Sequence, residues 1–205
     1  TAFNGLKKGT IAGKGVINNQ MTNHLMRRIE KAGIPTHFVQ ELSERETLVK
    51  KVSIVPLEVI VRNIAAGSFS KKYGVPEGTA LNNRVVEFSL KSDELGDPMI
   101  NDSQITAIGV ATQAELDELR AMALRVDELM TELFAKCGIR LVDFKLEFGR
   151  AGGELLLCDE ISPDSCRLWD AETNRKMDKD RFRRDLGNVL DGYRDVLARL
   201  QAAHV

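Results

Sequence analysis

Residues 141–149 read LVDFKLEFG, and this stretch decides the fold of the chain. Its residues alternate between charged and apolar, and side chains along a β-strand point to opposite faces with a period of two. The stretch therefore predicts a strand with Asp143, Lys145 and Glu147 on one face and apolar residues on the other. Burying three charged side chains in a row costs free energy, which only a charged partner can offset. A metal-bound polyphosphate fits that requirement, and an exposed strand face with ordinary cross-strand ion pairs is the alternative.

The composition is that of a globular chain with 205 residues, enough for one large domain or two small ones. A hydrophobic fraction of 43% and a charged fraction of 29% are ordinary for that class. The formal net charge of -1 argues against nucleic acid or a membrane surface as a partner, because both require a basic excess. No apolar run approaches the length of a membrane span.

The cysteines and histidines also restrict the chemistry. Three cysteines without a CxxC pair indicate reduced thiols in the cytoplasm and argue against a disulfide frame or a zinc site. None of the histidines stands near a polar cluster in the sequence, which argues against a histidine-based triad or metal site. These histidines are His24, His37 and His204.

Apolar periodicity and turn residues predict an α+β chain. Helices are expected at 18–32, 65–73, 113–137 and 178–202, and strands at 47–52, 57–63, 85–91, 139–148 and 154–160. Helix 113–137 has the clearest signals, since Thr112 and Glu115 form a capping box and Gly138 ends it. Val55-Pro56 is expected to interrupt the strands as a hinge between two lobes, because proline breaks a strand ladder.

Strands 139–148 and 154–160 are joined by a glycine-rich segment, which predicts a β-hairpin. Glu147 and Asp159 can share a metal ion only if both lie on the same face of that hairpin. Side chains opposite each other in an antiparallel pair share a face, so the paired residue numbers must then sum to an even value. We therefore expect a loop of three or five residues, or a bulge.

Two further polar segments are candidates for ligand binding. Strand 57–63 ends in Arg62-Asn63, and small residues lead into a helix with Ser68 in its first turn. A helix start offers free amides to a phosphate and an arginine adds a fork of donors, although an arginine salt bridge beside a helix cap would look alike. Residues 162–170 read SPDSCRLWD and are expected to form a polar loop, where binding groups concentrate.

That polar loop has a structural alternative, a tight turn with Trp169 anchored in the core and Arg167 lying along the surface. Cys166 has no base beside it and is expected to be unreactive.

Five segments together resemble the SAICAR synthetase family, the phosphoribosylaminoimidazole-succinocarboxamide synthases of purine biosynthesis. They follow the family's order and spacing over nearly the whole chain and comprise residues 55–68, 97–101, 141–149, 159–170 and 176–183. The resemblance implies a ligase that joins carboxyaminoimidazole ribonucleotide (CAIR) to L-aspartate with ATP, giving SAICAR, ADP and phosphate. It also implies a two-lobed ATP-binding α+β fold, mainly antiparallel sheet with flanking helices, in a cytoplasmic homodimer.

The family begins with a strand pair whose Gly-Lys turn covers the ATP phosphates, and this sequence starts after that pair. Residues 1–54 are therefore expected to be the remainder of the N-terminal ATP-binding lobe. Residues 55–205 are expected to form the C-terminal lobe with the substrate and metal site.

The resemblance also implies roles for individual residues. Lys145 and Asp143 are the catalytic candidates, and Glu147 and Asp159 are expected to bind Mg²⁺. The ATP site is expected to contain Lys145 together with Lys50, Lys51 and Val52, the last three next to adenine. Expected substrate contacts are Arg62, Ser68 and Arg167 at the ribonucleotide phosphate, Asp164 at the aminoimidazole, and Asp97, Lys179 and Arg183 around CAIR or aspartate.

Two other functions stay open on the residues alone. Asp143-Phe144-Lys145 is similar to the metal-binding triplet of protein kinases, which would make the chain another phosphotransferase. However, Lys stands where that triplet has Gly, and the sequence has no HRD-type loop. The second alternative is a nucleotide-binding remnant that acts by association and without catalysis.

Overall fold

The computed structural model describes residues 2 and 5–203. Its main sheet has six strands in the order β5-β4-β3-β6-β7, with β8 paired to the first part of β6. Every neighbouring pair in this sheet is antiparallel. The strands are β3 (Ser53–Ile64), β4 (Ala80–Leu90), β5 (Met99–Ile100), β6 (Ile139–Ala151), β7 (Glu154–Cys158) and β8 (Cys166–Asp170).

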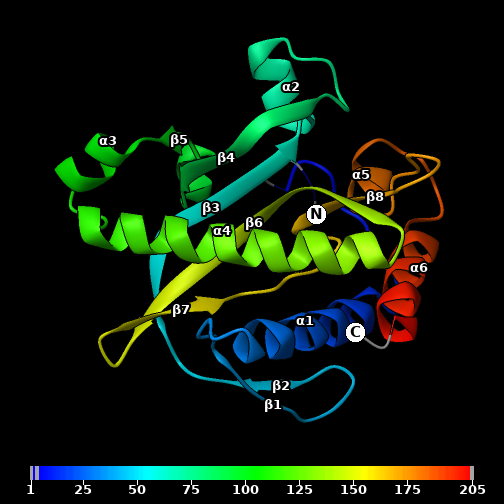
Figure 1. Cartoon of the computed structure of the whole chain (residues 1–205), viewed down its shortest axis with the longest axis horizontal. Helices are drawn as coiled ribbons and strands as arrows, with labels where there is room; N and C mark the ends of the chain where they lie inside the picture. The colour runs from blue at the N-terminus through cyan, green and yellow to red at the C-terminus, as the bar shows by residue number, and fades with distance from the viewer. Residues whose placement is uncertain (1, 3–4, 204–205) are drawn as a thin grey trace.

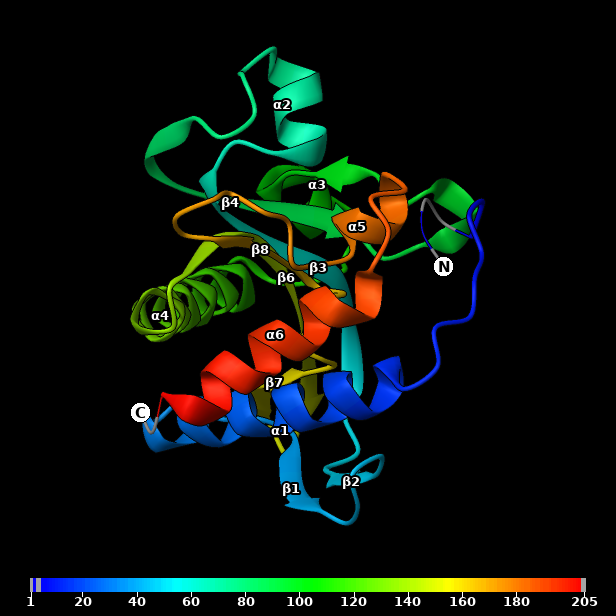
Figure 2. The same ribbon diagram turned by 90° about the vertical axis from the view of Figure 1, so that its right-hand side faces the viewer.

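Helices cover one side and one end of this sheet (Figures 1 and 2). α4 (Gln113–Lys136) lies across one face of the sheet. α1 (Lys14–Lys31) and α6 (Val189–Ala202) lie side by side below the sheet in the view of Figure 2. A separate two-stranded sheet, β1 (Phe38–Glu41) and β2 (Thr47–Val49), lies beyond α1. The short helices are α2 (Gly67–Tyr73), η1 (Asp93–Leu95), α3 (Asp102–Ala107) and α5 (Asp180–Arg183).

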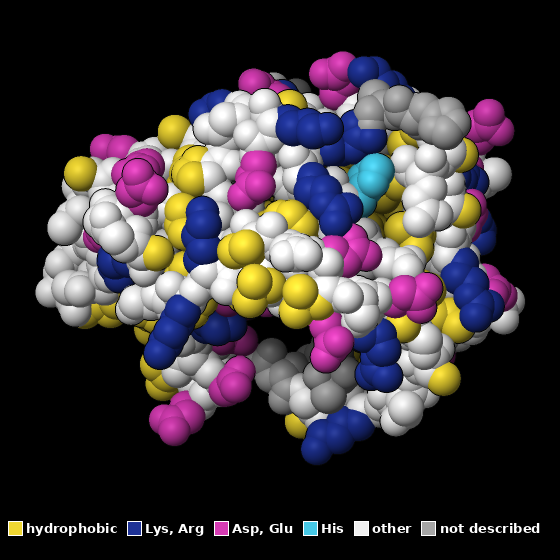
Figure 3. Space-filling model, turned by 90° about the horizontal axis from the view of Figure 1, so that it is seen from below, with side chains coloured by type: hydrophobic (Ala, Val, Ile, Leu, Met, Phe, Trp, Pro, Cys, Tyr) yellow, Lys and Arg dark blue, Asp and Glu magenta, His cyan; other side chains and the backbone are white. Residues whose placement is uncertain are grey.

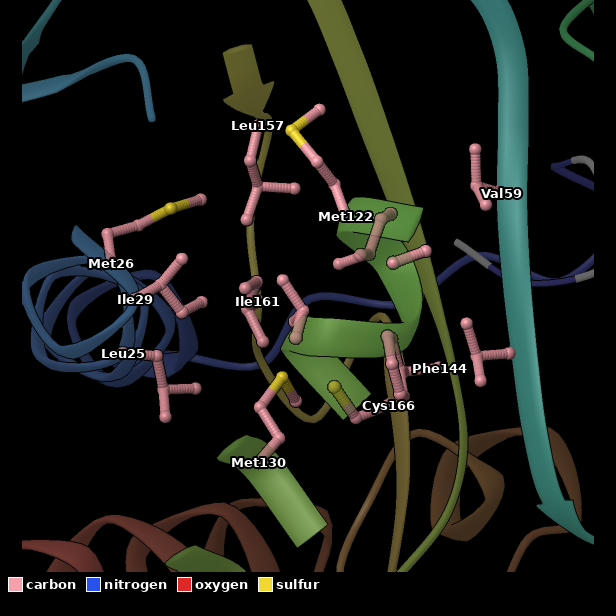
Figure 4. Close-up of a cluster of buried hydrophobic side chains, with 14 of the residues drawn as sticks. Leu25, Met26, Ile29, Val59, Met122, Met130, Phe144, Leu157, Ile161 and Cys166 are labelled. Atoms are coloured by element: carbon pink, nitrogen blue, oxygen red, sulfur yellow. The ribbon is translucent and has the colours of Figure 1, made fainter. Parts of the chain in front are cut away.

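The position of α4 determines which face of the sheet is apolar. Its predicted capping box is confirmed, since Thr112 Oγ1 accepts from the Glu115 amide at 3.2 Å and Glu115 Oε2 accepts from the Thr112 amide at 2.9 Å. Figure 4 shows side chains of α4 and α1 converging with Phe144 of β6 and Val59 of β3. Because alternate residues of these strands enter this core, the charged residues between them must lie on the opposite face.

Three sequence-based expectations about elements are wrong. β3 runs unbroken through Val55-Pro56, because its ladder with β6 shifts register between Ile54 and Glu58 and so tolerates the missing proline N–H. The expected helix 178–202 is divided into α5 and α6, since Asp185, Gly187 and Asn188 all have left-handed backbone between them. The expected loop 162–170 ends early, because residues 166–170 pair with β6 as β8.

The surface mixes charges of both signs. Figure 3 shows Lys and Arg side chains alternating with Asp and Glu over the lower face, with hydrophobic side chains scattered between them. Within residues 2 and 5–203, no helix is long and apolar enough to cross a membrane.

Candidate active site

The polar faces of β3 and β6 meet in register. Arg62 of β3 pairs with Asp143 of β6, and Glu58 pairs with Glu147 four residues away on each strand. A cleft of about 630 Å³ opens on this face. The cleft brings together nine of the residues predicted from the sequence, namely Arg62, Ser68, Asp97, Asp143, Lys145, Asp164, Arg167, Lys179 and Arg183.

One end of the cleft contains two arginines that share one acid, and we call Arg62, Asp143 and Arg167 the arginine cluster. Asp143 Oδ2 lies 3.0 Å from Arg62 Nη1 and 2.9 Å from Arg167 Nη1. Arg62 also donates to Glu87 at 2.6 Å and to Ser68 at 3.1 Å, and Arg167 donates to Asp180 at 2.9 Å. Burial raises the pKa of the Asp143 carboxyl, and the charges of Arg167 and Arg62 act against that rise.

A glycine makes room for this arrangement. Gly67 has a left-handed φ of +54°, and a Cβ at this position would lie 2.3 Å from Arg167 Nη2. Only glycine lets the start of α2 approach the guanidinium so closely.

At the other end of the cleft, Glu58 and Lys145 line the wall. Lys145 contacts Glu147 and Asp159, and Glu147 also contacts Lys91; we call these five residues the lysine cluster. The two predicted metal ligands, Glu147 and Asp159, do not themselves line this cleft. Lys145 Nζ lies 2.5 Å from Glu147 Oε1, 3.2 Å from Glu58 Oε1 and 3.6 Å from Asp159 Oδ2. Lys91 Nζ lies 2.9 Å from the same Glu147 oxygen. The two predicted metal ligands therefore share one lysine neighbour.

The protonation of this cluster follows from its neighbours. Burial would raise the pKa of Glu147, but hydrogen bonds and charge from Lys145 and Lys91 outweigh burial and lower it. Burial, and then the negative charge of Glu147, raise the pKa of Asp159. The pKa of Lys145 is raised, because its three acidic neighbours outweigh the effect of burial.

The predicted hairpin register is wrong, although Asp159 still reaches the lysine cluster. Ala151 pairs with Glu154 across a two-residue turn, and Glu147 pairs with Cys158, so the paired numbers sum to an odd value. β7 ends at Cys158, and Asp159 has a left-handed φ of 62°. That single residue breaks the alternation of the strand, and its carboxylate lies near Lys145 rather than in the core.

The remaining predicted substrate residues lie around the rim of the cleft. Asp164 lies in the loop between β7 and β8. Lys179 lies near it, and burial lowers the pKa of the Lys179 amine. Arg183 Nη1 donates to Asp180 Oδ1 at 2.8 Å. Asp97 has a left-handed φ of 50° and accepts from the Ser92 amide at 2.9 Å, so its carboxylate also fixes the turn that it belongs to.

The residues expected next to adenine do not line this cleft. Lys50 and Lys51 are exposed, and the Lys50 amide donates to the His37 carbonyl at 2.7 Å. Val52 packs against Gly149. A Cβ added to Gly149 would lie 2.4 Å from the Cγ2 atom of Val52. Their role at ATP stays a prediction.

Other members of the site were missed from the sequence. Glu58 and Arg62 are four residues apart on one strand, so the alternation that placed Arg62 could also have placed Glu58. Lys91 and Asp180 come from separate elements, and no local pattern marks them. Burial lowers the pKa of His37, and the charge of the nearby Asp159 carboxylate acts against that lowering. A histidine therefore does lie near the polar cluster, which corrects the expectation from the sequence; His204 lies outside the described residues.

The chain also matches known proteins. A family model described as SAICAR synthetase matches residues 1–200. The chain belongs to the SAICAR synthetase family. A phosphoribosylaminoimidazole-succinocarboxamide synthase from Lachnoclostridium phytofermentans is 60% identical over 200 residues, which cover 98% of this chain and 85% of that relative.

Solved structures of SAICAR synthetases have the same fold. The crystal structure of the synthase from Ehrlichia chaffeensis has a TM-score of 0.96 at 47% identity, covering 98% of this chain and 87% of that one. A SAICAR synthetase in complex with ADP also has a TM-score of 0.96, at 43% identity and with the same coverage of 98% and 87%. The α+β fold with a mainly antiparallel sheet is confirmed.

Family membership also confirms the enzyme class and the reaction. The chain is a ligase of purine biosynthesis, and its reaction joins CAIR to L-aspartate with ATP. This result favours the ligase over the phosphotransferase and the non-catalytic remnant.

Proposed function

We propose that both halves of the ligase reaction take place in the cleft on the polar face of β3 and β6. The observation that carries this proposal is that paired residues of β3 and β6 supply the centres of both clusters, Arg62 with Asp143 and Glu58 with Glu147, with Lys145 between them on β6. Residues 143 and 147 are about 13 Å apart along a strand. A ribonucleotide can extend between them, with its phosphate at the arginines and its carboxylate toward the lysines.

The residues suit a reaction through an acyl phosphate. The carboxylate of CAIR takes the γ-phosphoryl group of ATP and releases ADP, and the amine of L-aspartate then attacks the acyl carbon and displaces phosphate. Lys145 and Lys91 are placed to neutralise the transferred phosphoryl group, while Arg62 and Arg167 hold the ribonucleotide phosphate. Ser68, Asp97, Asp164, Lys179 and Arg183 complete the substrate contacts, and the protein supplies no covalent nucleophile.

Glu147 and Asp159 fit a magnesium site. Mg²⁺ usually binds to proteins through one or two carboxylates together with substrate phosphates. Two neighbouring carboxylates, of which Glu147 raises the pKa of Asp159, favour a divalent cation between them. Within residues 2 and 5–203, no group of three or more His, Cys, Asp or Glu side chains could hold a metal by itself, so substrate phosphates would complete the coordination. The ion would neutralise charge on the phosphates of ATP.

The proposal includes four expectations carried by the family resemblance. Residues 1–54 and 55–205 form two lobes, and Lys50, Lys51 and Val52 lie next to adenine. The enzyme is a homo-oligomer in the cytoplasm. Cys137, Cys158 and Cys166 form no disulfide with one another, which suits a cytoplasmic location.

The test is an ADP-release assay with ATP, CAIR, L-aspartate and Mg²⁺, in which each component is omitted in turn. We expect SAICAR to form only when all four are present, and chelation of Mg²⁺ to abolish the increase in melting temperature caused by ADP. Glu147→Gln should lose that metal-dependent increase, whereas the exposed Glu154→Gln should keep it. Repeated turnover of ATP with a stable phosphorylated product and no consumption of aspartate would favour the phosphotransferase. Turnover without Mg²⁺ would contradict the proposed metal site.

A further inference from the structure

Three donors from two helices hold the carboxylate of Asp164. Lys14 Nζ and Asn18 Nδ2 of α1 lie 2.5 and 2.7 Å from Asp164 Oδ2. Tyr193 Oη of α6 lies 2.7 Å from Asp164 Oδ1. The three donors are far from Asp164 in the sequence, and the packing of α1 against α6 brings them together.

The two oxygens of this carboxylate differ in what they can still accept. Each carboxylate oxygen has two acceptor positions. Oδ2 uses both, on Lys14 and Asn18, whereas among the described residues Oδ1 accepts only from Tyr193. Asp164 lines the cleft, so a donor bound there would find its free acceptor position on Oδ1.

Tyr193 acts on this oxygen from outside the cleft. It is 1% exposed and does not line the cleft, so it cannot touch a ligand there. A buried tyrosine hydroxyl needs a partner, and its partner here is a charged group of the site rather than a backbone carbonyl. Phenylalanine would fill the same space in the core, so what the hydroxyl adds is its hydrogen bond to Asp164.

We propose that Tyr193 is a positioning residue of the ligase, which aims Asp164 Oδ1 at an N–H donor of the aminoimidazole of CAIR. Lys14 and Asn18 complete the frame by occupying the other oxygen. This inference rests on the proposed contact between Asp164 and the substrate.

The charges around Asp164 keep it an acceptor. Lys14 from α1 and Lys179 from the start of α5 are the cations that face it, and Glu160 from its own loop is the facing acid. Burial would raise the pKa of Asp164, but Lys14 and the Tyr193 hydroxyl outweigh burial and lower it. An ionised carboxylate accepts hydrogen bonds and donates none, which suits recognition of an amine.

The test compares Tyr193→Phe with Val196→Ala, a change to a buried side chain of the same helix that has no hydrogen-bond donor for Asp164. By calorimetry, we expect Tyr193→Phe to weaken CAIR binding about tenfold, the effect of one lost charge-assisted hydrogen bond, and to leave ADP binding unchanged. Val196→Ala should lower the melting temperature and leave both affinities unchanged. Equal losses for CAIR and ADP, or no loss for CAIR, would overturn the proposal.

A second comparison repeats Tyr193→Phe in the Asp164→Asn background. If Tyr193 acts through Asp164, the added substitution should change CAIR binding less than about twofold. A further tenfold loss would mean that Tyr193 acts independently of Asp164. If Asp164→Asn binds CAIR like the wild type, the assignment of Asp164 in the proposed function fails; if only Tyr193→Phe has no effect, this inference alone fails.

Discussion

At the Asp143 end of β6 the cations are arginines that are more buried than the lysines at the Glu147 end. The side chains of Arg62 and Arg167 are 4% and 17% exposed, against 28% for Lys145 and 43% for Lys91. An arginine presents a planar fork with fixed geometry, and a lysine presents a mobile point charge. The arginine cluster is therefore a rigid frame, and the lysine cluster is a set of charges that can exchange partners.

The difference fits the roles proposed above for the two clusters. The ribonucleotide phosphate keeps its charge and position through the reaction, so a rigid frame suits it. The phosphoryl group moves from ATP to CAIR and then leaves, so mobile cations suit it. The two clusters should therefore respond differently to substitution.

The largest effect is expected at the lysine cluster. Glu147→Ala should lower turnover on the order of 10²–10³-fold, because it removes one of the two carboxylates proposed to hold the Mg²⁺ that neutralises the reacting phosphates. The fold should survive, since Lys145 keeps Glu58 and Asp159 as partners and Lys91 is partly exposed. ADP release measures turnover, and thermal melting measures whether the fold survives. Loss of the cooperative melt would show that this cluster is as structural as the arginine cluster.

The arginine cluster should show a loss of binding together with a loss of stability. Arg62→Ala should weaken CAIR binding by about 1.5–3 kcal/mol, through the loss of charge-assisted hydrogen bonds, and leave ADP binding nearly unchanged. The melting temperature should also fall, because buried Asp143 loses one of its two arginines. Calorimetry with CAIR and with ADP measures the two affinities, and the exposed Arg194→Ala serves as the control. Equal losses for CAIR and ADP would remove Arg62 from the phosphate site.

A smaller effect tests whether the arginine frame is rigid. Gly67 begins α2 and Gly74 caps its C-terminal end, with similar left-handed φ values of +54° and +67°, but only a Cβ on Gly67 would meet Arg167. Alanine at either position should cost roughly 1–2 kcal/mol of stability from backbone strain. Only Gly67→Ala should also weaken CAIR binding, because it displaces the guanidinium. If both variants bind CAIR equally well, Arg167 can shift without loss and the frame is not rigid.

The sequence predicted the parts of the site that depend on local periodicity. The alternation on residues 141–149 placed Asp143, Lys145 and Glu147 on one face, and the capping box placed the start of α4. Pairing between strands is not local, so Lys91 was missed and the hairpin register was wrong, because residues 149–153 are compatible with several turn lengths. The roles of the individual site residues remain predictions.

The left-handed backbone of Asp159 restricts which residues can replace it. Glutamate carries the same charge and serves at Glu147 nearby, but it does not share the tolerance of aspartate for a left-handed φ. Asparagine and glycine tolerate that conformation but carry no charge. Asparagine is therefore the substitution that removes the charge and leaves the chain path intact, whereas alanine would alter both at once and confuse a lost ligand with a bent backbone.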